Sequence, residues 1–398
     1  MLPLVLPAFL ALCVNAHEHG RGDFYQQPIG MEIVDVANEP WTSKYGPQSD
    51  LGYSGPLSFS HLPYTRCLED GTARFDIGIL GMPFDTTTSY RPGARFGPFA
   101  IRSGSRRQGT GRATLAWGTS PEELGAALLD CGDIPISAMD NAKALDQMES
   151  AYSTLLARPV HGGTTAAYKP STAAFALDEK EHPRLVTLGG DHTIVLPILR
   201  ALNKVYGPVS AIHLDAHLDT WIPRPGMSKQ ERINHGSFFA IAAEEGLLSN
   251  TSIHAGIRCH MGPEDLTHDG DIGFQLISTE DIDEYGLPEV VKKIRQRIGQ
   301  SPVYLSLDID VVDPGLAPAT GTPEPGGWTT REVKRILRGL SGLNFVGADI
   351  VEVAPAYDHA DITGIAAADI VYDFLAMMQL DSPPLPHVGP FSKSDVGR

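Results

Sequence analysis

Residues Val209–Trp221 read VSAIHLDAHLDTW. The stretch begins with small and branched apolar residues, as a buried strand would, and continues with a polar side chain at every second position. His213, Asp215, His217 and Asp219 alternate with apolar residues, so the period of a strand puts all four on one side. Two imidazoles and two carboxylates placed together indicate a cation site at the end of a parallel strand.

Seven further runs have the same character, being short, rich in Val, Ile and Leu, and closed by Gly or an acidic residue. They are FDIGILG (75–81), LLDCG (128–132), RLVTLGG (184–190), SIHAGIR (252–258), FQLIS (274–278), VYLSLDID (303–310) and FVGADIVEV (345–353). The helix-like segments are Asn141–Leu156, Ile194–Tyr206, Leu287–Ile298, Thr330–Leu340 and Ile362–Met378. This alternation predicts an α/β fold with a doubly wound parallel sheet of about eight strands and helices on both faces.

The chain of 398 residues divides into four parts. Residues 1–16, MLPLVLPAFLALCVNA, are apolar, too short to span a bilayer, and end in a small-x-small sequence, so we predict a secretory signal peptide. Residues 17–73 are predicted to be an N-terminal extension, 74–380 the main domain, and 381–398 a flexible tail. We therefore expect a protein that is secreted or lies in the lumen of the secretory pathway, with no transmembrane helix after cleavage.

The formal charge of −17 argues against nucleic acid or an anionic membrane as a partner and suits a protein that binds cations. Removal of the signal peptide would leave Cys67, Cys131 and Cys259, which allow one disulfide at most. A glycosylation sequon at Asn250 is consistent with the secretory route.

Acidic and histidine residues cluster at four predicted strand ends, GGDH (189–192), DAHLD (215–219), SLDID (306–310) and DIVEV (349–353). Ligands bind beyond the carboxyl ends of the strands in open parallel sheets. The candidate metal ligands are His192, Asp215, His217, Asp219, Asp308 and Asp310. Four crowded carboxylates would raise one another's pKa values, and two divalent cations would balance their charge. Oxygen ligands with two imidazoles and no thiol favour Mn²⁺ over structural Zn²⁺. We expect His213, one step deeper in the strand, to be a buried supporting residue.

These motifs resemble the ureohydrolase family of arginase, agmatinase and their relatives. GGDH, DAHLD and SLDIDVVDPGLAPATGTPEPGG occur in the family's order and approximate spacing. TGTPEPGG (320–327), VGADIVEVAPAYD (346–358) and RPGARFGPFAIR (91–102) are more similar to agmatinase than to arginase. The resemblance covers about residues 74–380 and implies the three-layer α/β/α arginase fold.

The resemblance also implies two Mn²⁺ ions per chain. One ion is expected on His192, Asp215, Asp219 and Asp308, and the other on Asp215, His217, Asp308 and Asp310, with Asp215 and Asp308 bridging. Such a pair of ions supplies hydroxide near neutral pH.

Hydrolysis of a guanidinium group needs more than this nucleophile, because its charge is delocalised and its amine leaves poorly. A carboxylate matches the planar fork of the guanidinium, and a histidine titrating near neutrality can give a proton to the departing amine. Glu352 in VEVAP and His235 in INHGSF hold the family positions for these two catalytic, substrate-binding roles.

The expected products are urea and an amine. Thr220-Trp221 after Asp219 is similar to the usage of some agmatinases, which disfavours arginine and favours hydrolysis of agmatine to putrescine and urea. The loop 220–234 carries three cations, Arg224, Lys229 and Arg232, and one anion. This excess would suit a carboxylate tail, so the alternative is a guanidinobutyrase that converts 4-guanidinobutyrate to 4-aminobutyrate and urea.

Two rival interpretations are a zinc deacetylase, which shares the fold but uses a single zinc, and a secreted metal-binding protein without activity. The first would not keep both His192 and the full DAHLD and DID sets. The second would release no urea. The expected partner is a small guanidino substrate, and the family resemblance implies a homo-oligomer, trimer or hexamer.

Overall fold

The computed structural model describes residues 41–46, 48, 50–109, 113–166, 168 and 172–385. The predicted signal peptide, residues 17–40 of the predicted extension and residues 386–398 of the predicted tail lie outside the described residues. Contacts divide the chain into a unit of Met1–Gly55, which contains helix α1 (Trp41–Tyr45), and a unit of Pro56–Arg398. Residues 56–73 therefore belong to the same compact unit as the main domain. None of the helices in the described part of the chain has the length and hydrophobicity needed to cross a bilayer.

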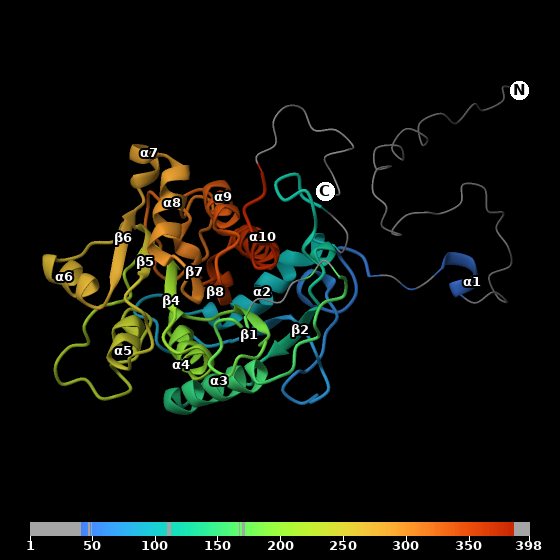
Figure 1. Ribbon diagram of the computed structural model, residues 1–398, viewed down its shortest axis with the longest axis horizontal. Coiled ribbons are helices and arrows are strands. Elements are labelled where there is room, and N and C mark those ends of the chain that lie inside the picture. The colour runs from blue at the N-terminus through green and yellow to red at the C-terminus, as the bar shows by residue number, and fades with distance from the viewer. Residues whose placement is uncertain are drawn as a thin grey trace, which may run out of the picture. The chain divides into compact units, whose positions relative to one another are not determined.

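The second unit is built on one parallel sheet of eight strands (Figure 1). The strands are β1 (Ile77–Gly81), β2 (Leu128–Asp133), β3 (Arg184–Leu188), β4 (Ser210–Leu214), β5 (Ser252–Ile257), β6 (Phe274–Ser278), β7 (Val303–Asp308) and β8 (Phe345–Val351). Seven of the eight predicted runs contain one of these strands in full, and the run 128–132 contains all of β2 except Asp133. Their order across the sheet is β2-β1-β3-β8-β7-β4-β5-β6, so the predicted α/β fold with a parallel sheet is confirmed.

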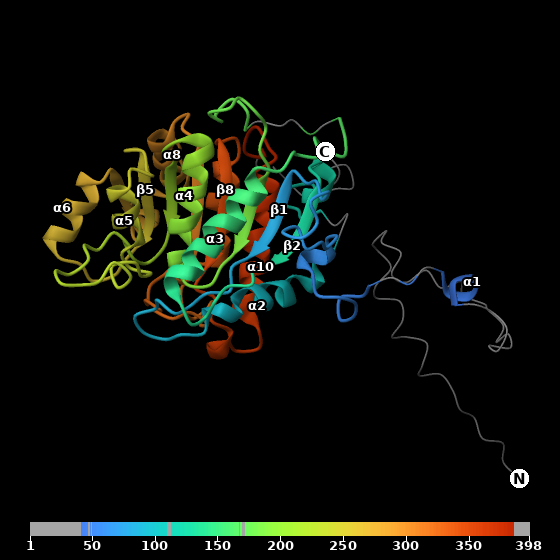
Figure 2. The same ribbon diagram turned by 90° about the horizontal axis from the view of Figure 1, so that it is seen from below.

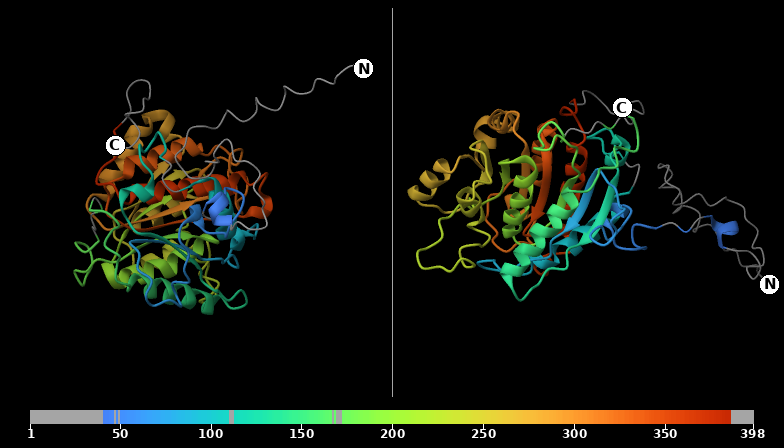
Figure 3. Two further views of the ribbon diagram at one scale, coloured as in Figure 1. Left: turned by 90° about the vertical axis from the view of Figure 1, so that its right-hand side faces the viewer. Right: turned by 60° about the horizontal axis from the view of Figure 1, so that its bottom comes forward.

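Helices cover both faces of the sheet, which gives three layers (Figures 1 and 2). One face carries α3 (Asn141–Leu156), α4 (Val195–Tyr206) and α5 (Phe238–Glu244). The opposite face carries α2 (Gly97–Gly104), α8 (Leu287–Ile298), α9 (Thr330–Leu340) and α10 (Ile362–Met377). Two further helices, α6 (Pro263–Asp271) and α7 (Asp281–Tyr285), flank β6 in the sequence. The same layers are seen from other directions in Figure 3.

The core lies between the sheet and each helical layer, and alternate strand residues serve opposite faces. Ile79 and Ile212 are fully buried with the apolar side chains of α8, α9 and α10. Their neighbours Leu80 and Ala211 are fully buried with those of α3 and α4. Every residue of β1, β3, β4, β5, β7 and β8 is buried, so these strands read as continuous apolar runs in the sequence.

The five predicted helices, α3, α4, α8, α9 and α10, are confirmed with nearly the predicted ends. Capping residues explain why some helix ends could be predicted from the sequence. Asp140 accepts a hydrogen bond from the main-chain N–H of Lys143 at the start of α3, and Thr329 and Glu332 form a capping box at the start of α9.

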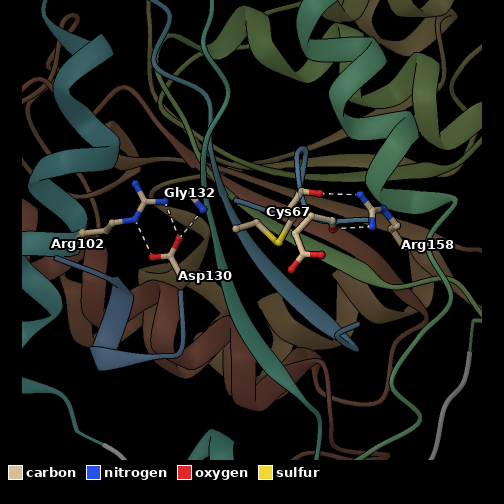
Figure 4. The surroundings of a disulfide bond; sticks show 7 residues. Cys67, Arg102, Asp130, Gly132 and Arg158 are labelled. Atoms are coloured by element: carbon tan, nitrogen blue, oxygen red, sulfur yellow. Dashed lines mark hydrogen bonds and ion pairs between the residues drawn. A yellow bond between two sulfur atoms is a disulfide. The ribbon is translucent and has the colours of Figure 1, made fainter. Parts of the chain in front are cut away.

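A disulfide between Cys67 and Cys131 joins the segment before β1 to the edge strand β2 (Figure 4). Beside it, Arg102 binds Asp130 through Nε at 2.8 Å and Nη2 at 2.9 Å, and Arg158 donates to the carbonyl oxygen of Cys67 at 2.7 Å. The disulfide thus attaches the segment before β1 to the β2 edge of the sheet, and the two arginines bind on either side of it. Cys259 is free and buried, in agreement with the expected single disulfide.

Candidate active site

The candidate residues follow the carboxyl ends of four neighbouring strands at the centre of the sheet. His192 comes after β3, Glu352 after β8, and the residues of DAHLD after β4, while β7 ends at Asp308. Since β3, β8, β7 and β4 are consecutive in the sheet, their ends converge. The strand-like alternation predicted through His213–Asp219 is not observed, because β4 ends at Leu214 and residues 215–219 form a loop.

A first cluster surrounds the imidazole of His192. Its Nδ1 lies 3.1 Å from Asp215 Oδ2, 3.0 Å from Asp219 Oδ2 and 3.4 Å from Asp308 Oδ2. All four side chains are almost completely buried. The four residues predicted for one ion are therefore brought together.

Neighbouring side chains fix which nitrogen of His192 faces the carboxylates. Ser306 donates its hydroxyl proton to Asp349 at 2.9 Å, so its oxygen must accept from His192 Nε2, 2.7 Å away. With the ring proton on Nε2, the lone pair of Nδ1 points at three carboxylates. This is the tautomer that a metal ligand requires.

A second cluster surrounds His217, which is partly exposed. Its Nδ1 lies 3.3 Å from Asp215 Oδ1 and 3.0 Å from Asp310 Oδ2, and its Nε2 lies 3.6 Å from Glu324. Asp215 therefore takes part in both clusters. Asp308 contacts the first cluster, and its Oδ1 accepts the main-chain N–H of Asp310 at 2.8 Å, so a bridging role for Asp308 stays a prediction.

Burial and charge affect the carboxylates of these clusters differently. Burial, followed by the negative charge of Asp215, raises the pKa of Asp310 to about 6, and burial with the charges of Asp310 and Asp215 also raises the pKa of Asp308. Burial raises the pKa of Asp215 too, but three surrounding histidines, His213 foremost, hold it well below its usual range. The expected mutual repulsion therefore raises the pKa values of Asp308, the last residue of β7, and Asp310.

The geometry of both clusters fits divalent cations. Nδ1 of His192 and Oδ2 of Asp215 are buried without an aligned hydrogen bond to a described residue. Burial lowers the pKa of His192, but the three carboxylates raise it well above its usual value, so a positive charge is favoured at this point. Oxygen and imidazole donors of this kind suit Mn²⁺.

Glu352 and His235 lie together beside the first cluster. Glu352 Oε1 accepts the main-chain N–H of His192 at 2.8 Å and lies 3.1 Å from His235 Nδ1. Its second oxygen, Oε2, is buried and has no hydrogen-bond partner among the described residues. A buried carboxylate oxygen without a donor is costly, which indicates that a ligand supplies one.

Asp219 and Glu352 have left-handed backbone conformations, with φ of 55° and 61°. Such conformations are unfavourable for residues other than glycine and concentrate at functional sites. Here they occur in the segments that follow β4 and β8, which carry the two carboxylates to the candidate site.

A cleft of about 500 Å³ lies beside the site and has Asp219 in its lining. His217, Asp219, His235 and Asp308 line its floor with parts of Thr87, Thr88 and Ser89, while Trp221, Arg224 and Met227 come from the loop after DAHLD. The loop 220–234 carries three cations and one anion. One of these cations, Arg232, is not available to a ligand, because it pairs with Glu244 at 2.6 Å. Arg224 does line the cleft.

The sequence did not identify several residues that support the site. Ser89 contacts His235 Nε2 through its hydroxyl at 2.7 Å and its main-chain N–H at 2.9 Å. Ser306 and Asp349 lie in the motifs SLDID and DIVEV, but no role was predicted for either residue. The polar run TTTS (86–89), which begins five residues after the end of β1, was the available signal for Ser89, and the polar positions inside β7 and β8 were the signal for the other two.

The chain belongs to the arginase family, whose model matches residues 75–377. The fold and the clustered His and Asp residues described above are those of the matched region.

Within the family the chain is similar to proteins named agmatinase. It is 51% identical to "Putative agmatinase 1" of Schizosaccharomyces pombe over 83% of this chain and 84% of that protein. It is 36% identical to an agmatinase of Chromobacterium violaceum over 84% of this chain and 92% of that protein. The solved structure of proclavaminate amidino hydrolase from Streptomyces clavuligerus matches with a TM-score of 0.70 and 35% identity, over 83% of this chain and 99% of that one.

Proposed function

We propose that this protein is a binuclear manganese ureohydrolase that cleaves agmatine to putrescine and urea. The observation that carries the proposal is the buried Glu352 Oε2, which has no donor and lies beside His235 next to the two His/Asp clusters. Similarity to agmatinases at 51% and 36% identity supports agmatine as the first candidate substrate.

In this proposal His192, Asp215, Asp219 and Asp308 hold one Mn²⁺ ion, and Asp215, His217, Asp308 and Asp310 hold the other. Bound divalent ions lower the pKa of water and so supply the nucleophile. The protein contributes the ligand geometry, which is already in place because the aspartates also accept main-chain hydrogen bonds. Asp215, for example, accepts the N–H of His217 at 2.6 Å.

Glu352 orients the guanidinium group. Its Oε2 accepts an N–H of the substrate, while Oε1 remains bound to His192 and His235. A charge-assisted hydrogen bond of this kind places the planar group in one orientation over the clusters.

His235 supplies the proton that the departing amine needs. Burial lowers the pKa of His235, but the hydrogen bond and charge of Glu352 raise it to about 9, so the ring is protonated at neutral pH. Ser89 offers Nε2 both a donor and a hydroxyl, so the ring finds a partner before and after the proton leaves.

A second candidate substrate is 4-guanidinobutyrate, as a specific observation favours it. Arg224 lines the cleft and forms no ion pair with a described residue, and the lining carboxylates belong to the clusters. An unpaired guanidinium at the cleft suits a carboxylate tail better than the ammonium of agmatine.

A urea-release assay on the Mn²⁺-loaded protein tests these proposals, with agmatine, 4-guanidinobutyrate, guanidinopropionate and arginine compared. Agmatine is expected to give the highest kcat/KM, and a higher value for 4-guanidinobutyrate would make the second candidate the function. Release of urea from none of the four would favour a metal-binding protein without activity.

Arg224→Gln separates the two substrates further. If the tail of 4-guanidinobutyrate binds Arg224, the variant loses up to about fivefold in kcat/KM for that substrate, because an exposed ion pair contributes up to about 1 kcal/mol. Agmatine hydrolysis should hold or rise. Lys229→Gln, on the same loop but outside the cleft lining, is the matched control.

We also propose that the protein is secreted or lies in the secretory lumen. The Cys67–Cys131 disulfide supports this location, since such bonds persist in oxidising compartments. Asn250 of the sequon is exposed and precedes β5. A mobility shift of the protein from its native source after removal of N-glycans, absent in Asn250→Gln, would support the proposal.

A homo-oligomer, trimer or hexamer, is proposed on family resemblance. The packed pair α2 and α10 carries exposed apolar side chains. Phe99 in α2 and Phe96 just before it are 64% and 60% exposed, and Ile362 and Ile365 in α10 are 46% and 42% exposed. Light scattering coupled to size-exclusion chromatography tests it, and a monomer would reject it.

A further inference from the structure

A row of polar side chains crosses the centre of the sheet just below the candidate metal ligands. In register they are Thr187 on β3, Asp349 on β8, Ser306 on β7, His213 on β4 and His254 on β5. All five are fully buried. Polar residues in register on five adjacent strands need a reason, because buried polar groups are costly unless they are bonded.

Part of the row is explained by His192, which Ser306 and Asp349 orient. The other part forms a second chain of contacts. His213 Nε2 lies 2.8 Å from Asp215 Oδ2, and His213 Nδ1 lies 2.7 Å from His254 Nδ1. His254 Nε2 in turn lies 2.9 Å from Asp269 on α6.

The two ends of this chain determine where its protons sit. A carboxylate at each end requires an N–H on the nearest ring nitrogen, so His213 presents Nε2–H to Asp215 and His254 presents Nε2–H to Asp269. Between the rings, one Nδ1 must donate to the other, so a single proton connects the two imidazoles. The ring of His254 stacks on Phe274 with centroids 4.1 Å apart and an interplanar angle of 9°.

Asp269 also connects this chain to a second candidate ligand. Its Oδ1 accepts the hydroxyl of Thr220 at 2.8 Å, and Thr220 directly follows Asp219. One carboxylate of α6 therefore supports Asp215 through two imidazoles and the backbone beside Asp219 through a threonine.

We propose that His254 and Asp269 are positioning residues for the metal centre, which hold His213 in the orientation and tautomer that keep Asp215 Oδ2 directed at the cation. The contact between His213 Nε2 and Asp215 Oδ2 is close but not aligned as a hydrogen bond, so Oδ2 keeps lone pairs for the cation. This inference rests on the proposed manganese site. It concerns His254, two contacts away from Asp215, and Asp269, three contacts away, which bind neither ion nor substrate.

The test compares His254→Leu with His254→Gln, whose amide N–H can still donate to His213. Calorimetric titration of the metal-free protein with Mn²⁺ should give about 10–100-fold weaker binding for the leucine variant, the usual cost of losing a partner of a metal ligand. His254→Gln should recover most of this loss. KM for the guanidino substrate should stay near the wild-type value while kcat falls, since Glu352 and His235 are unchanged.

Phe274→Leu is the matched control, because it removes packing against His254 without removing a hydrogen bond. It should lower Tm but leave Mn²⁺ affinity unchanged. Wild-type Mn²⁺ affinity in His254→Leu, or an equal loss in Phe274→Leu, would overturn the inference. Should His254→Leu not fold, Asp269→Asn replaces it, with weaker binding expected and wild-type binding contrary to the inference.

Measurements on the wild-type protein distinguish a failure of the proposed function from a failure of the positioning role of His254 and Asp269. Failure of the wild type to bind Mn²⁺ or to release urea would reject the proposed function and the inference with it. Normal wild-type behaviour together with unaltered variants would reject the inference alone.

Discussion

At the scale of single residues, His235 combines burial with two well-placed partners. Glu352 holds its Nδ1 at 3.1 Å, and Ser89 can serve Nε2 as a donor or an acceptor. This arrangement allows the ring to give up a proton without moving. It is the reason why the rate should depend on pH in a defined direction.

We expect kcat/KM to fall as the pH rises through about 9. Burial lowers the pKa of His235, but Glu352 raises it to about 9, so the acid form is present below this pH and lost above it. His235→Asn should lower kcat by about 100-fold or more and remove this basic limb, with Mn²⁺ content unchanged. A pH profile of steady-state rates provides the measurement, and the same limb in the variant would contradict the assignment.

Asp308→Ala should abolish urea release and reduce the bound Mn²⁺. Asp308 is buried against His192, so removing it takes away a ligand and one of the carboxylates that favour a cation there. Elemental analysis and the urea assay measure the effect. Asp369→Ala, which removes a carboxylate on α10 that pairs with Lys334, is the control and should retain both. A fully active Asp308→Ala protein would refute the ligand set.

The candidate ligands were readable from the sequence because acidic and imidazole side chains at strand ends are rare in apolar runs. The supporting residues were harder to find. Ser306 and Asp349 resemble ordinary polar interruptions of a strand, and their roles emerge only when β7 and β8 pair in register. Asp269 lies 50 positions after Asp219, and no local pattern connects the two.

At the scale of elements, strands were predicted better than helices. Buried parallel strands leave compact apolar runs, whereas α6 buries only Asp269 and has no apolar stripe. Helix α5, FFAIAAE, is too short to display a helical period, and α2 is bounded by glycines. The alternation drawn through DAHLD was wrong as a strand, because β4 ends at Leu214 and residues 215–219 form a loop.

The element most open to test is the edge strand β2, which is joined to the preceding segment by a disulfide. Cys131→Ser should lower the free energy of unfolding by about 2–4 kcal/mol, since the bond closes a loop between positions separated by 64 residues. Denaturant unfolding measures this change. Activity per folded molecule should persist, because neither cysteine lines the cleft. The reduced wild type is the control and should match the variant.

At the scale of the whole molecule, the net charge of −17 and the crowded aspartates favour a cation-loaded state. Mn²⁺ binds the folded chain and therefore stabilises it, by about 2.7 kcal/mol per site at a free concentration 100 times Kd. Tm should rise on Mn²⁺ addition and fall with a chelator. Asp308→Ala should lose most of this response, and a wild-type Tm indifferent to Mn²⁺ would argue against the metal centre.

The strand order carries a consequence for biosynthesis. β3 and β4 follow each other in the chain, yet β8 and β7 separate them in the sheet. While the ribosome has released only residues up to about 300, the two halves of the sheet share no edge, and His192 has no reason to meet DAHLD. Cation capture must therefore be a late event in the life of the nascent polypeptide, awaiting the insertion of its final two strands into the gap.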